Sequence, residues 1–366
     1  MLVGVLGGGQ LGRMLALAGI PLGMRFRFLD PAPEAPAGAV GELVVGAYDD
    51  EGALKELAEG ATVLTYEFEN VPVAAARSLA ERVTVLPPPE ALEAAQDRVA
   101  EKRLFARLGI PAAPWAPVGG PEELPAALAA VGAPALLKTR RLGYDGKGQA
   151  PVERPSDAGS AWEAVGRSPS ILEARVGFDR ELSVLAVRGR DGEVRAYPLV
   201  ENVHREGILR VSRAPAPGLT SDLQARAEGF ARRVLEELGY VGVLAIELFQ
   251  VGEQLLANEM APRVHNSGHW TIEGALTSQF ENHLRAVAGL PLGPTDPRGC
   301  SAMVNLIGAT PRPAEVLAVP GAHLHLYGKA PRPGRKLGHV TVVAEDEGTL
   351  EARLAEVRPA VERAAG

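Results

Sequence analysis

AIELFQVGEQLLANE (residues 245–259) contains two apolar runs separated by a glycine, which predicts a β-hairpin with its turn at Gly252. If the turn centres near residue 253, Glu247 and Glu259 lie opposite each other on one face, with Cβ atoms about 4.5–5.5 Å apart. Two opposed carboxylates destabilise a hairpin unless a cation lies between them, and Mg²⁺ prefers carboxylate oxygens. The stretch therefore predicts a magnesium site, with two solvated surface acids as the alternative.

Asn258 within this hairpin, and Arg263, His265 and Asn266 just beyond it, form a dense run of polar residues. A second candidate segment lies upstream, where Lys138 ends an apolar run. The glycine-rich stretch GYDGKGQ (143–149) follows it. Three glycines in six residues do not form a stable helix or strand, but such a loop can close over phosphates with its backbone N–H groups. It lacks the spacing of a Walker A loop, and a surface turn is the alternative.

The N-terminal segment predicts a strand over 2–6, a glycine turn and a helix over 10–18. GGGQLG (7–12) fits the pattern G-x-G-x-x-G, and Asp30 ends the next predicted strand, 18 residues past Gly12. A dinucleotide such as NAD or FAD, another anionic ligand, or a purely structural turn each fit this motif. The glycines interrupt the apolar run, so we interpret it as strand, turn and helix rather than as a signal peptide.

Segments of different pattern follow one another along the chain. Residues 1–90 alternate short apolar runs with helical patterns, which is typical of a parallel sheet with crossover helices. Three prolines at 87–89 mark a boundary, because proline continues neither a helix nor a central strand. One helix is predicted over 90–108 and a long amphipathic helix over 221–238. We expect two or three domains, with a mixed α/β and α+β fold.

Composition excludes several classes of protein. The 366 residues carry 38 Lys and Arg against 45 Asp and Glu, a net charge of -7, which argues against nucleic-acid binding by charge alone. A single cysteine excludes an internal disulfide framework and a multi-cysteine metal site. No apolar stretch reaches the ~18 residues of a membrane span. We therefore expect neither a nucleic-acid partner nor a membrane partner.

Four blocks of the sequence resemble a known family: GGGQLGRM (7–14), QDRVAEKRLF (96–105), GYDGKGQ (143–149) and NEMAPRVHNSGHW (258–270). Further likeness at TYEFENVP (65–72) and RPGRKLGH (332–339) extends the resemblance nearly from end to end. The sequence resembles the N5-carboxyaminoimidazole ribonucleotide synthetases, which are ATP-grasp ligases of purine biosynthesis. The block at 258–270 is the most specific of these motifs, and the glycine turn is the least specific.

The resemblance implies an ATP-grasp fold with an N-terminal, Rossmann-like pre-ATP-grasp α/β domain. We expect this first domain over 1–94, a small lid subdomain over 95–172, and a large domain with a C-terminal sheet extension over 173–366. The ATP-grasp core would span about 102–289. The implied reaction is the ATP- and bicarbonate-dependent carboxylation of 5-aminoimidazole ribonucleotide via carboxyphosphate, which releases ADP and phosphate in de novo IMP biosynthesis. Mg²⁺, for which Mn²⁺ could substitute, a cytoplasmic location and a homodimer are implied as well.

The resemblance also assigns roles to individual residues. It implies nucleotide contacts by Arg98, Lys138, Gly143, Tyr144, Asp145, Gly146, Lys147, Gly148, Gln149, Glu173, Ala174, Arg175, Val176, Glu181, His204, Asn258 and Glu259. It implies metal ligation by Glu247 and Glu259. Catalytic contacts to bicarbonate and the transferred phosphate are implied for Arg263, His265, Asn266 and Lys147. Contacts to the ribonucleotide are implied for Gln10, Glu67, Tyr144, Asp145, Lys329, Arg335 and Lys336.

Three other functions remain open from the sequence. An NAD(P)-dependent oxidoreductase would use the glycine turn and Asp30, but it leaves the carboxylate pair and the 143–149 loop unexplained. Another ATP-grasp ligase, acting on a different purine intermediate or carboxylate acid, would share the nucleotide residues. A nucleotide-sensing module without catalysis would lack a carboxylate or the lysine, and both carboxylates and Lys138 are present.

Overall fold

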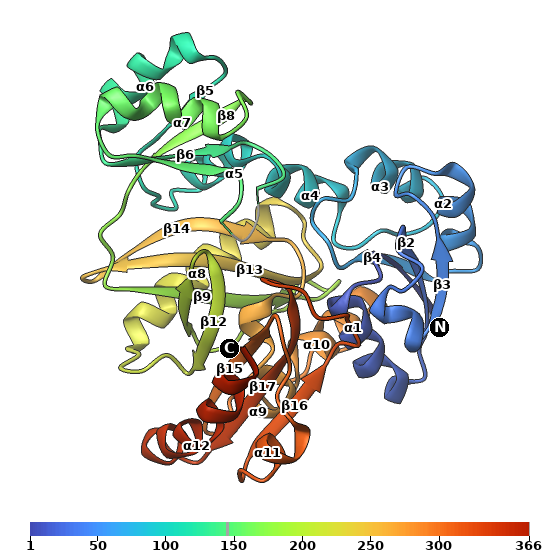
Figure 1. The fold of residues 1–366 in the computed structure, drawn as a ribbon. Helices are drawn as coiled ribbons and strands as arrows, with labels where there is room; N and C mark the ends of the chain where they lie inside the picture. Colours follow the sequence, from blue (N-terminus) through green and yellow to red (C-terminus); the bar gives the residue numbers. More distant parts are fainter. Residues whose placement is uncertain (144–145, 366) are drawn as a thin grey trace.

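Three β-sheets follow one another along the chain in the computed structural model, which describes residues 1–143 and 146–365 (Figure 1). The first is a parallel four-stranded sheet of order β3-β2-β1-β4. Its strands are β1 (Leu2–Leu6), β2 (Arg25–Asp30), β3 (Glu42–Val45) and β4 (Val63–Tyr66), and its helices are α1 (Gln10–Gly19), α2 (Glu51–Ala58) and α3 (Val73–Ala80). Because parallel strands end at one edge, the glycine turn, Asp30 and Glu67 meet there.

A break at Asp97 divides the next helical segment into α4 (Pro89–Gln96) and α5 (Arg98–Arg107). Asp97 is extended, and its Oδ1 accepts the N–H of Val99 at 3.0 Å, which is the geometry of an N-cap. The Arg140 guanidinium donates to the same carboxylate at 2.7 and 3.1 Å. The prediction of one helix over 90–108 is wrong, because this cap is secured by an arginine 43 positions away.

The second sheet is antiparallel, of order β5-β8-β6-β7, and carries α6 and α7. The elements are β5 (Trp115–Val118), α6 (Leu124–Val131), β6 (Ala135–Thr139), β7 (Gln149–Val152), α7 (Ala158–Ala164) and β8 (Ser170–Ala174). Lys138 pairs with Gln149, so the two ends of the glycine-rich loop are joined at its base. The predicted domain boundary after residue 172 lies inside β8. Figure 1 shows this unit at the top of the view, next to the β13–β14 hairpin.

The third sheet has nine antiparallel strands in the order β14-β13-β9-β11-β12-β15-β17-β16, with β10 beside β9. Its strands are β9 (Arg180–Arg188), β10 (Val194–Ala196), β11 (Val200–Arg205), β12 (Ile208–Ala214), β13 (Gly242–Val251), β14 (Gln254–Ala261), β15 (Cys300–Ile307), β16 (Ala322–Leu326) and β17 (Lys336–Ala344). Its helices are α8 (Ser221–Glu237), α9 (Thr271–Gly274), α10 (Gln279–Ala288), α11 (Pro313–Leu317) and α12 (Glu347–Ala365). The prediction of an ATP-grasp-like antiparallel sheet behind a Rossmann-like domain is confirmed.

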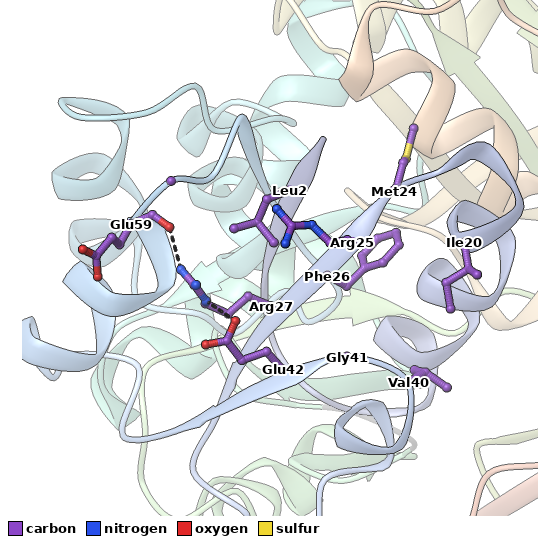
Figure 2. A pocket seen from close by; sticks show the side chains of 11 residues that line it. Leu2, Ile20, Met24, Arg25, Phe26, Arg27, Val40, Gly41, Glu42 and Glu59 are labelled. Atoms are coloured by element: carbon purple, nitrogen blue, oxygen red, sulfur yellow. Dashed lines mark hydrogen bonds and ion pairs between the residues drawn. The ribbon is translucent and has the colours of Figure 1, made fainter.

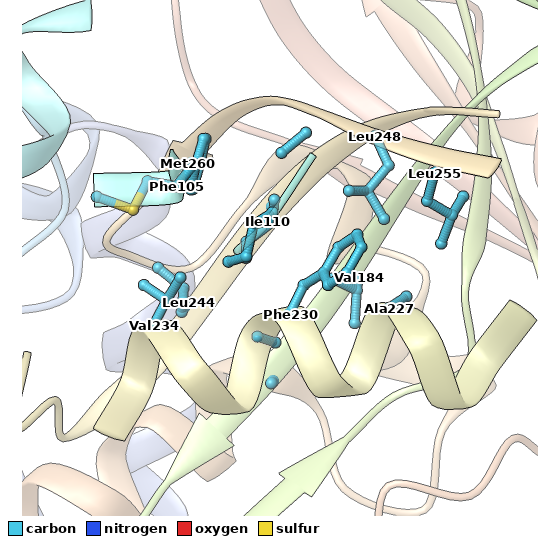
Figure 3. Close-up of a cluster of buried hydrophobic side chains, with 14 of the residues drawn as sticks. Phe105, Ile110, Val184, Ala227, Phe230, Val234, Leu244, Leu248, Leu255 and Met260 are labelled. Atoms are coloured by element: carbon cyan, nitrogen blue, oxygen red, sulfur yellow. The ribbon is translucent and has the colours of Figure 1, made fainter. Parts of the chain in front are cut away.

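Helix α8 covers one face of this sheet because its apolar residues recur at helical spacing. Ala227, Phe230 and Val234 face Val184 of β9 and Leu244 of β13 in one buried cluster (Figure 3). Phe105 of α5 and Met260 of β14 belong to the same cluster, so α5 is fixed against the hairpin. Within residues 1–143 and 146–365, no helix is both long enough and apolar enough to cross a lipid bilayer.

Candidate functional site

The β13–β14 hairpin places Glu247 directly opposite Glu259. The turn joins Val251 to Gln254, so uninterrupted pairing from this turn would set Glu247 against Asn258. A β-bulge instead shifts the register by one residue, with Asn258 as the additional residue. The predicted opposition is confirmed, but it arises from the bulge and not from a turn centred at residue 253.

The two carboxylates have unequal surroundings. Loss of hydration, and then repulsion from Glu259, raise the pKa of Glu247 to about 7. Loss of hydration also opposes ionisation of Glu259. Nη1 of Arg98 lies 2.8 Å from Glu259 Oε2, however, and this contact lowers the pKa of Glu259 to about 2. Nε2 of His265 is 3.4 Å from Glu247 Oε1. The pair thus combines a well-compensated anion with one that a further cation would stabilise.

The atoms around this pair fit a divalent cation. A small cavity of about 10 Å³ beside Glu247 and Asn258 is also lined by Glu181 and His204. Asn258 Oδ1 is buried and has no hydrogen-bond partner in the described part of the chain. No three His, Cys, Asp or Glu side chains within the described ranges form a complete metal site. Mg²⁺ commonly takes one or two carboxylates and completes its shell with substrate phosphates, and the two glutamates with Asn258 fit that pattern.

Lys138 and Glu173 form a buried ion pair where β6 and β8 meet. Lys138 Nζ lies 2.9 Å from Glu173 Oε2, and Nζ of Lys102 is 3.8 Å from the same oxygen. Burial disfavours the Glu173 anion, but the charges of Lys138 and Lys102, with the Lys138 hydrogen bond and the Arg98 charge, together outweigh it and lower the pKa of Glu173. Two ammonium groups thus share one carboxylate at the inner edge of the small sheet. The Lys138 ammonium, near the end of its strand, is placed where a phosphate could share it.

The glycine-rich loop leaves the small sheet and approaches the large one. Its described residues are Gly143, Gly146, Lys147, Gly148 and Gln149, and the predicted contacts Tyr144 and Asp145 lie outside the described residues. Gly146 and Gly148 have φ of 77° and 71°, which favours glycine. A Cβ on Gly146 would lie 3.4 Å from the carbonyl oxygen of Glu206, in the β11–β12 turn. Gly146 therefore lies against the β11–β12 turn of the large sheet.

The segment after β14 carries the predicted residues Arg263, His265 and Asn266 close to the Glu247–Glu259 pair. Arg263 forms an ion pair with Glu69. Burial disfavours the Arg263 cation, but the Glu69 contact and the charges of Glu67 and Glu259 together outweigh it and raise the pKa of Arg263. Burial, and then the Arg263 charge, lower the pKa of His265 to about 3, so this ring is neutral at physiological pH. Asn266 Nδ2 is buried without a partner among the described residues. An arginine, a neutral imidazole and an uncommitted amide suit a small oxyanion such as bicarbonate.

Of the predicted nucleotide contacts, Glu181 and His204 line the small cavity, whereas the predicted hinge at 173–176 lies at the end of β8. The N–H groups of Ala174 and Arg175 donate to the carbonyls of Pro114 and Pro134 at 2.8 and 3.0 Å. Base recognition at this hinge would therefore fall to carbonyl groups or to Val176. Further along, His204 Nδ1 contacts the Glu181 carboxylate. Burial disfavours the charged ring, but this contact and the charge of Glu247 together outweigh it and raise the pKa of His204.

The glycine turn is occupied by a side chain of the protein itself. Glu67 accepts the N–H of Gly9 at 2.8 Å and those of Leu11 and Gly12 at 3.1 Å, at the N-terminus of α1. Asp30 accepts the N–H of Gly8 at 2.8 Å. A carboxylate thus fills the place that a dinucleotide pyrophosphate takes in a Rossmann turn. This geometry argues against the oxidoreductase alternative, while the predicted ribonucleotide contact of Glu67 remains a prediction.

A basic cluster joins the C-terminal tail to the start of α1. Lys329 Nζ donates to Gln10 Oε1, across 319 positions of sequence. Burial, and then the neighbouring Arg335 and Lys336, lower the pKa of Lys329 to about 8. The charge of Lys336 also acts on Glu247 and His265, so this cluster borders the carboxylate pair. Three cations close to one another suit the phosphate of a ribonucleotide.

A separate cavity of about 660 Å³ lies at the opposite edge of the first sheet, between the starts of β1, β2 and β3 (Figure 2). Two of its charged groups, Arg27 and Glu42, form an ion pair with each other. Arg27 Nε lies 2.8 Å from Glu42 Oε2, and Arg27 also donates to the carbonyls of Glu56 and Glu59. Ligands of parallel sheets bind at the carboxyl ends of the strands, whereas this cavity is at the amino ends. We therefore assign the chemistry to the carboxylate pair.

Four residues at this site were missed by sequence reasoning: Glu69, Asp97, Glu101 and Lys102. Glu101 and Lys102 lie three and four positions after Arg98, on one face of a helix, and this spacing was available as a signal. Asp97 caps α5 through the N–H of Val99, and an aspartate before a helix is a local signal. Glu69 acts through Arg263, far away in the sequence, so no local pattern indicates it.

Three family models match successive parts of the chain. They describe a ribonucleotide synthetase preATP-grasp domain over residues 1–96, an ATP-grasp domain over 103–280, and a phosphoribosylaminoimidazole carboxylase C-terminal domain over 301–353. The N5-carboxyaminoimidazole ribonucleotide synthase of Pseudomonas aeruginosa is 55% identical over 362 residues, which cover 99% of this chain and 100% of that protein.

Solved structures give the same result. The N5-carboxyaminoimidazole ribonucleotide synthetase from Thermus thermophilus matches with a TM-score of 0.95 and 64% identity, over 98% of each chain. The Aspergillus clavatus enzyme, in complex with ADP and 5-aminoimidazole ribonucleotide, matches with a TM-score of 0.92 and 35% identity, over 99% of this chain and 98% of that one. Sequence identity, fold and the chemistry of the site agree from end to end, and this chain belongs to the N5-carboxyaminoimidazole ribonucleotide synthases, a family of ATP-grasp ligases.

Proposed function

We propose that the chain uses ATP and bicarbonate to carboxylate the exocyclic amine of 5-aminoimidazole ribonucleotide, releasing ADP and phosphate. The observation that carries this proposal is the placement of Glu247 opposite Glu259, with Arg98 on the second carboxylate. This is an arrangement for charge neutralisation, and phosphoryl transfer depends chiefly on charge neutralisation and positioning. Membership of the family supports the same reaction.

ATP would lie between the small and the large sheet. Glu247 and Glu259 would hold Mg²⁺, or Mn²⁺ in its place, and the metal would supply positive charge to the phosphates. Arg98 and Lys138 would bind phosphate oxygens, and Asn258 would face them. The backbone at 173–176 would hold the adenine, and Glu181 and His204 the ribose side. Residues 143–149 would close over the phosphates and exclude water.

Bicarbonate would bind beside Arg263, His265 and Asn266, with Lys147 reaching it from the loop. The γ-phosphoryl group passes to a bicarbonate oxygen, so the bond to ADP breaks and carboxyphosphate forms. The amine nitrogen then bonds to the carboxyl carbon, either directly or after release of CO₂. The carbon–oxygen bond to phosphate breaks and the amine gives up a proton. Because carboxyphosphate is labile in water, exclusion of solvent by the loop favours capture over hydrolysis.

The ribonucleotide would lie across the carboxyl edge of the first sheet. Lys329, Arg335 and Lys336 would bind its phosphate with Gln10, and Glu67, Tyr144 and Asp145 would contact the rest of the molecule. We further propose the division into the regions 1–94, 95–172 and 173–366, with an ATP-grasp core at about 102–289, a homodimeric assembly and a cytoplasmic location.

Release of ADP in a coupled spectrophotometric assay tests this function. With ATP, Mg²⁺ and bicarbonate present, 5-aminoimidazole ribonucleotide should stimulate ADP release, and labelled bicarbonate should enter an acid-labile product. Inosine monophosphate is the matched control, because it has a ribose phosphate but no exocyclic amine, and it should not stimulate. Stimulation that does not require the aminoimidazole would contradict the substrate assignment and favour another ATP-grasp ligase.

A further inference from the structure

Helix α5 contacts four consecutive residues of β14 through three side chains of its own. Arg98 binds the Glu259 carboxylate at 2.8 Å, as described above. Glu101 Oε1 accepts the backbone N–H of Met260 at 2.6 Å. Lys102 Nζ donates to the carbonyl oxygen of Asn258 at 2.6 Å and reaches that of Ala257 at 3.4 Å. The helix therefore holds the backbone on both sides of Glu259 as well as its side chain.

These contacts surround the bulge that brings the two carboxylates together. Leu248 pairs with Ala257 and Glu247 pairs with Glu259, so Asn258 is the additional residue. Without this bulge, Asn258 would face Glu247, and the Glu259 side chain would point to the other face of the sheet, because side chains alternate along a strand. The opposition of the carboxylates thus depends on this one-residue irregularity.

The position of β14 explains why such support is needed. β14 is the edge strand of its sheet, so its outer backbone groups have no neighbouring strand to bind them. Glu101 and Lys102 take over that role at the bulge, and Ala257 N–H donates to the carbonyl of Pro111 at 2.7 Å just before it. The outer edge at 257–260 is therefore bound by α5 and the chain that follows it.

The burial of Glu101 and Lys102 indicates that these side chains position the neighbouring backbone rather than simply fill the core. Glu101 is 2% exposed and Lys102 is 1% exposed. Burying charged side chains is costly, and apolar residues of similar volume often give equal or greater stability. Lys102 is also 3.8 Å from Glu173, which binds Lys138, so one ammonium connects the hairpin with the lysine of the small sheet.

We propose that Glu101 and Lys102 are positioning residues that set the Asn258 bulge and thereby hold Glu259 opposite Glu247. The inference rests on the proposed function, because it assumes that these two carboxylates bind the divalent metal. Neither Glu101 nor Lys102 touches the reacting atoms. They act on the metal and the phosphates through the backbone of β14.

Glu101 offers two conservative variants that separate position from charge. Burial raises the pKa of Glu101 to about 8. Glu101→Gln removes the ionisable group but keeps an oxygen at the same distance for the Met260 N–H. Glu101→Asp keeps the carboxyl group but is one methylene shorter and loses that contact. Binding of Mn²⁺ in the presence of ADP is measured from the electron paramagnetic resonance signal of free Mn²⁺. We expect Glu101→Asp to weaken binding about 10–100-fold, the range found when residues behind metal ligands are changed, and Glu101→Gln to keep it within about threefold.

Lys102→Met provides the second arm, with Arg103→Met as its matched control. Arg103 is the next residue of the same helix and is exposed. We expect weaker Mn²⁺ binding in Lys102→Met and unchanged binding in Arg103→Met. The KM for 5-aminoimidazole ribonucleotide, whose proposed contacts lie on other elements, should stay the same in every folded variant. Circular dichroism and thermal melting establish which variants are folded.

Wild-type Mn²⁺ binding by folded Glu101→Asp would overturn the inference, and so would equal losses in Glu101→Asp and Glu101→Gln. If Lys102→Met does not fold, the two Glu101 variants decide alone, because both are close in size to the native residue. Absence of Mn²⁺ binding in the wild-type protein would instead contradict the proposed metal role of Glu247 and Glu259.

Discussion

The facing carboxylates of Glu247 and Glu259 destabilise the folded protein when no cation is bound. Glu247 and Glu259 face each other on one side of a hairpin, and Arg98 compensates only the second of them. The first is left with a raised pKa and with the repulsion that a bound cation would relieve. Such strain is expected where a site is arranged for a ligand rather than for the empty protein.

We therefore expect Glu247→Gln to separate stability from function. The amide keeps the size of the side chain but removes one of the two facing charges. The free energy of unfolding without metal should rise by about 1 kcal/mol, as relief of strain at functional sites commonly gives. Turnover should fall at least ~100-fold, because charge neutralisation at the phosphates is lost. Urea unfolding and ADP release check both effects, and near-normal turnover would remove Glu247 from the metal site.

At the level of helices and strands, periodic patterns in the sequence predicted those elements whose formation depends on nearby residues. The strand over 2–6, the helix after the glycine turn and the hairpin turn at Gly252 are confirmed, because alternation and helical spacing report burial directly. The bulge at Asn258 and the break at Asp97 could not be predicted in this way. The bulge is held by Lys102, 156 positions away, and the cap by Arg140. The hairpin pattern indicated the carboxylate pair and the glycine spacing indicated the 143–149 loop, whereas the other individual site roles could be assigned only through the family resemblance.

The turn before α1 requires a glycine at position 9, because the Glu67 side chain approaches its backbone closely. Gly9 has φ −73°, which any residue can adopt, but a Cβ there would lie 2.5 Å from Glu67 Oε1. Gly9→Ala should therefore displace Glu67 and lower the free energy of unfolding by about 1–3 kcal/mol, as overpacking commonly does. Urea unfolding measures the change.

Gly229 in α8 is the matched control for this substitution. A Cβ on Gly229 would meet nothing within 4 Å. Gly229→Ala should raise the free energy of unfolding by about 0.5–1 kcal/mol, because alanine is the better helix former. A Gly9→Ala variant as stable as the wild type would contradict this prediction, because it would show that the Glu67 carboxylate can move without loss despite its three hydrogen bonds.

The molecule as a whole depends on contacts between units that are distant in sequence. His283 of α10 lies between the first and the third sheet. Its Nδ1 accepts the N–H of Val243 at 3.1 Å, so Nε2 carries the proton and donates to Thr65 Oγ1 at 2.8 Å. Thr65 belongs to β4, 218 positions away. The neutral ring thus joins the N-terminal sheet to the large one, and protonation of Nδ1 would break one of its two bonds.

Acid should weaken this junction in a defined pH range. Burial lowers the pKa of His283 to about 4 from 6.5, so the unfolded chain binds the proton more readily than the folded one. The free energy of unfolding should therefore fall as the pH drops from about 6.5 towards about 4, with a loss of about 2 kcal/mol by pH 5. His283→Gln does not titrate, so its stability deficit relative to the wild type should shrink by that amount between pH 7.5 and pH 5. The other buried histidines titrate in both proteins and cancel in the difference. Thr65→Val, which loses the hydrogen bond but keeps the histidine, should retain the wild-type slope, and a pH-independent deficit in His283→Gln would show that this ring is not buried in the neutral form.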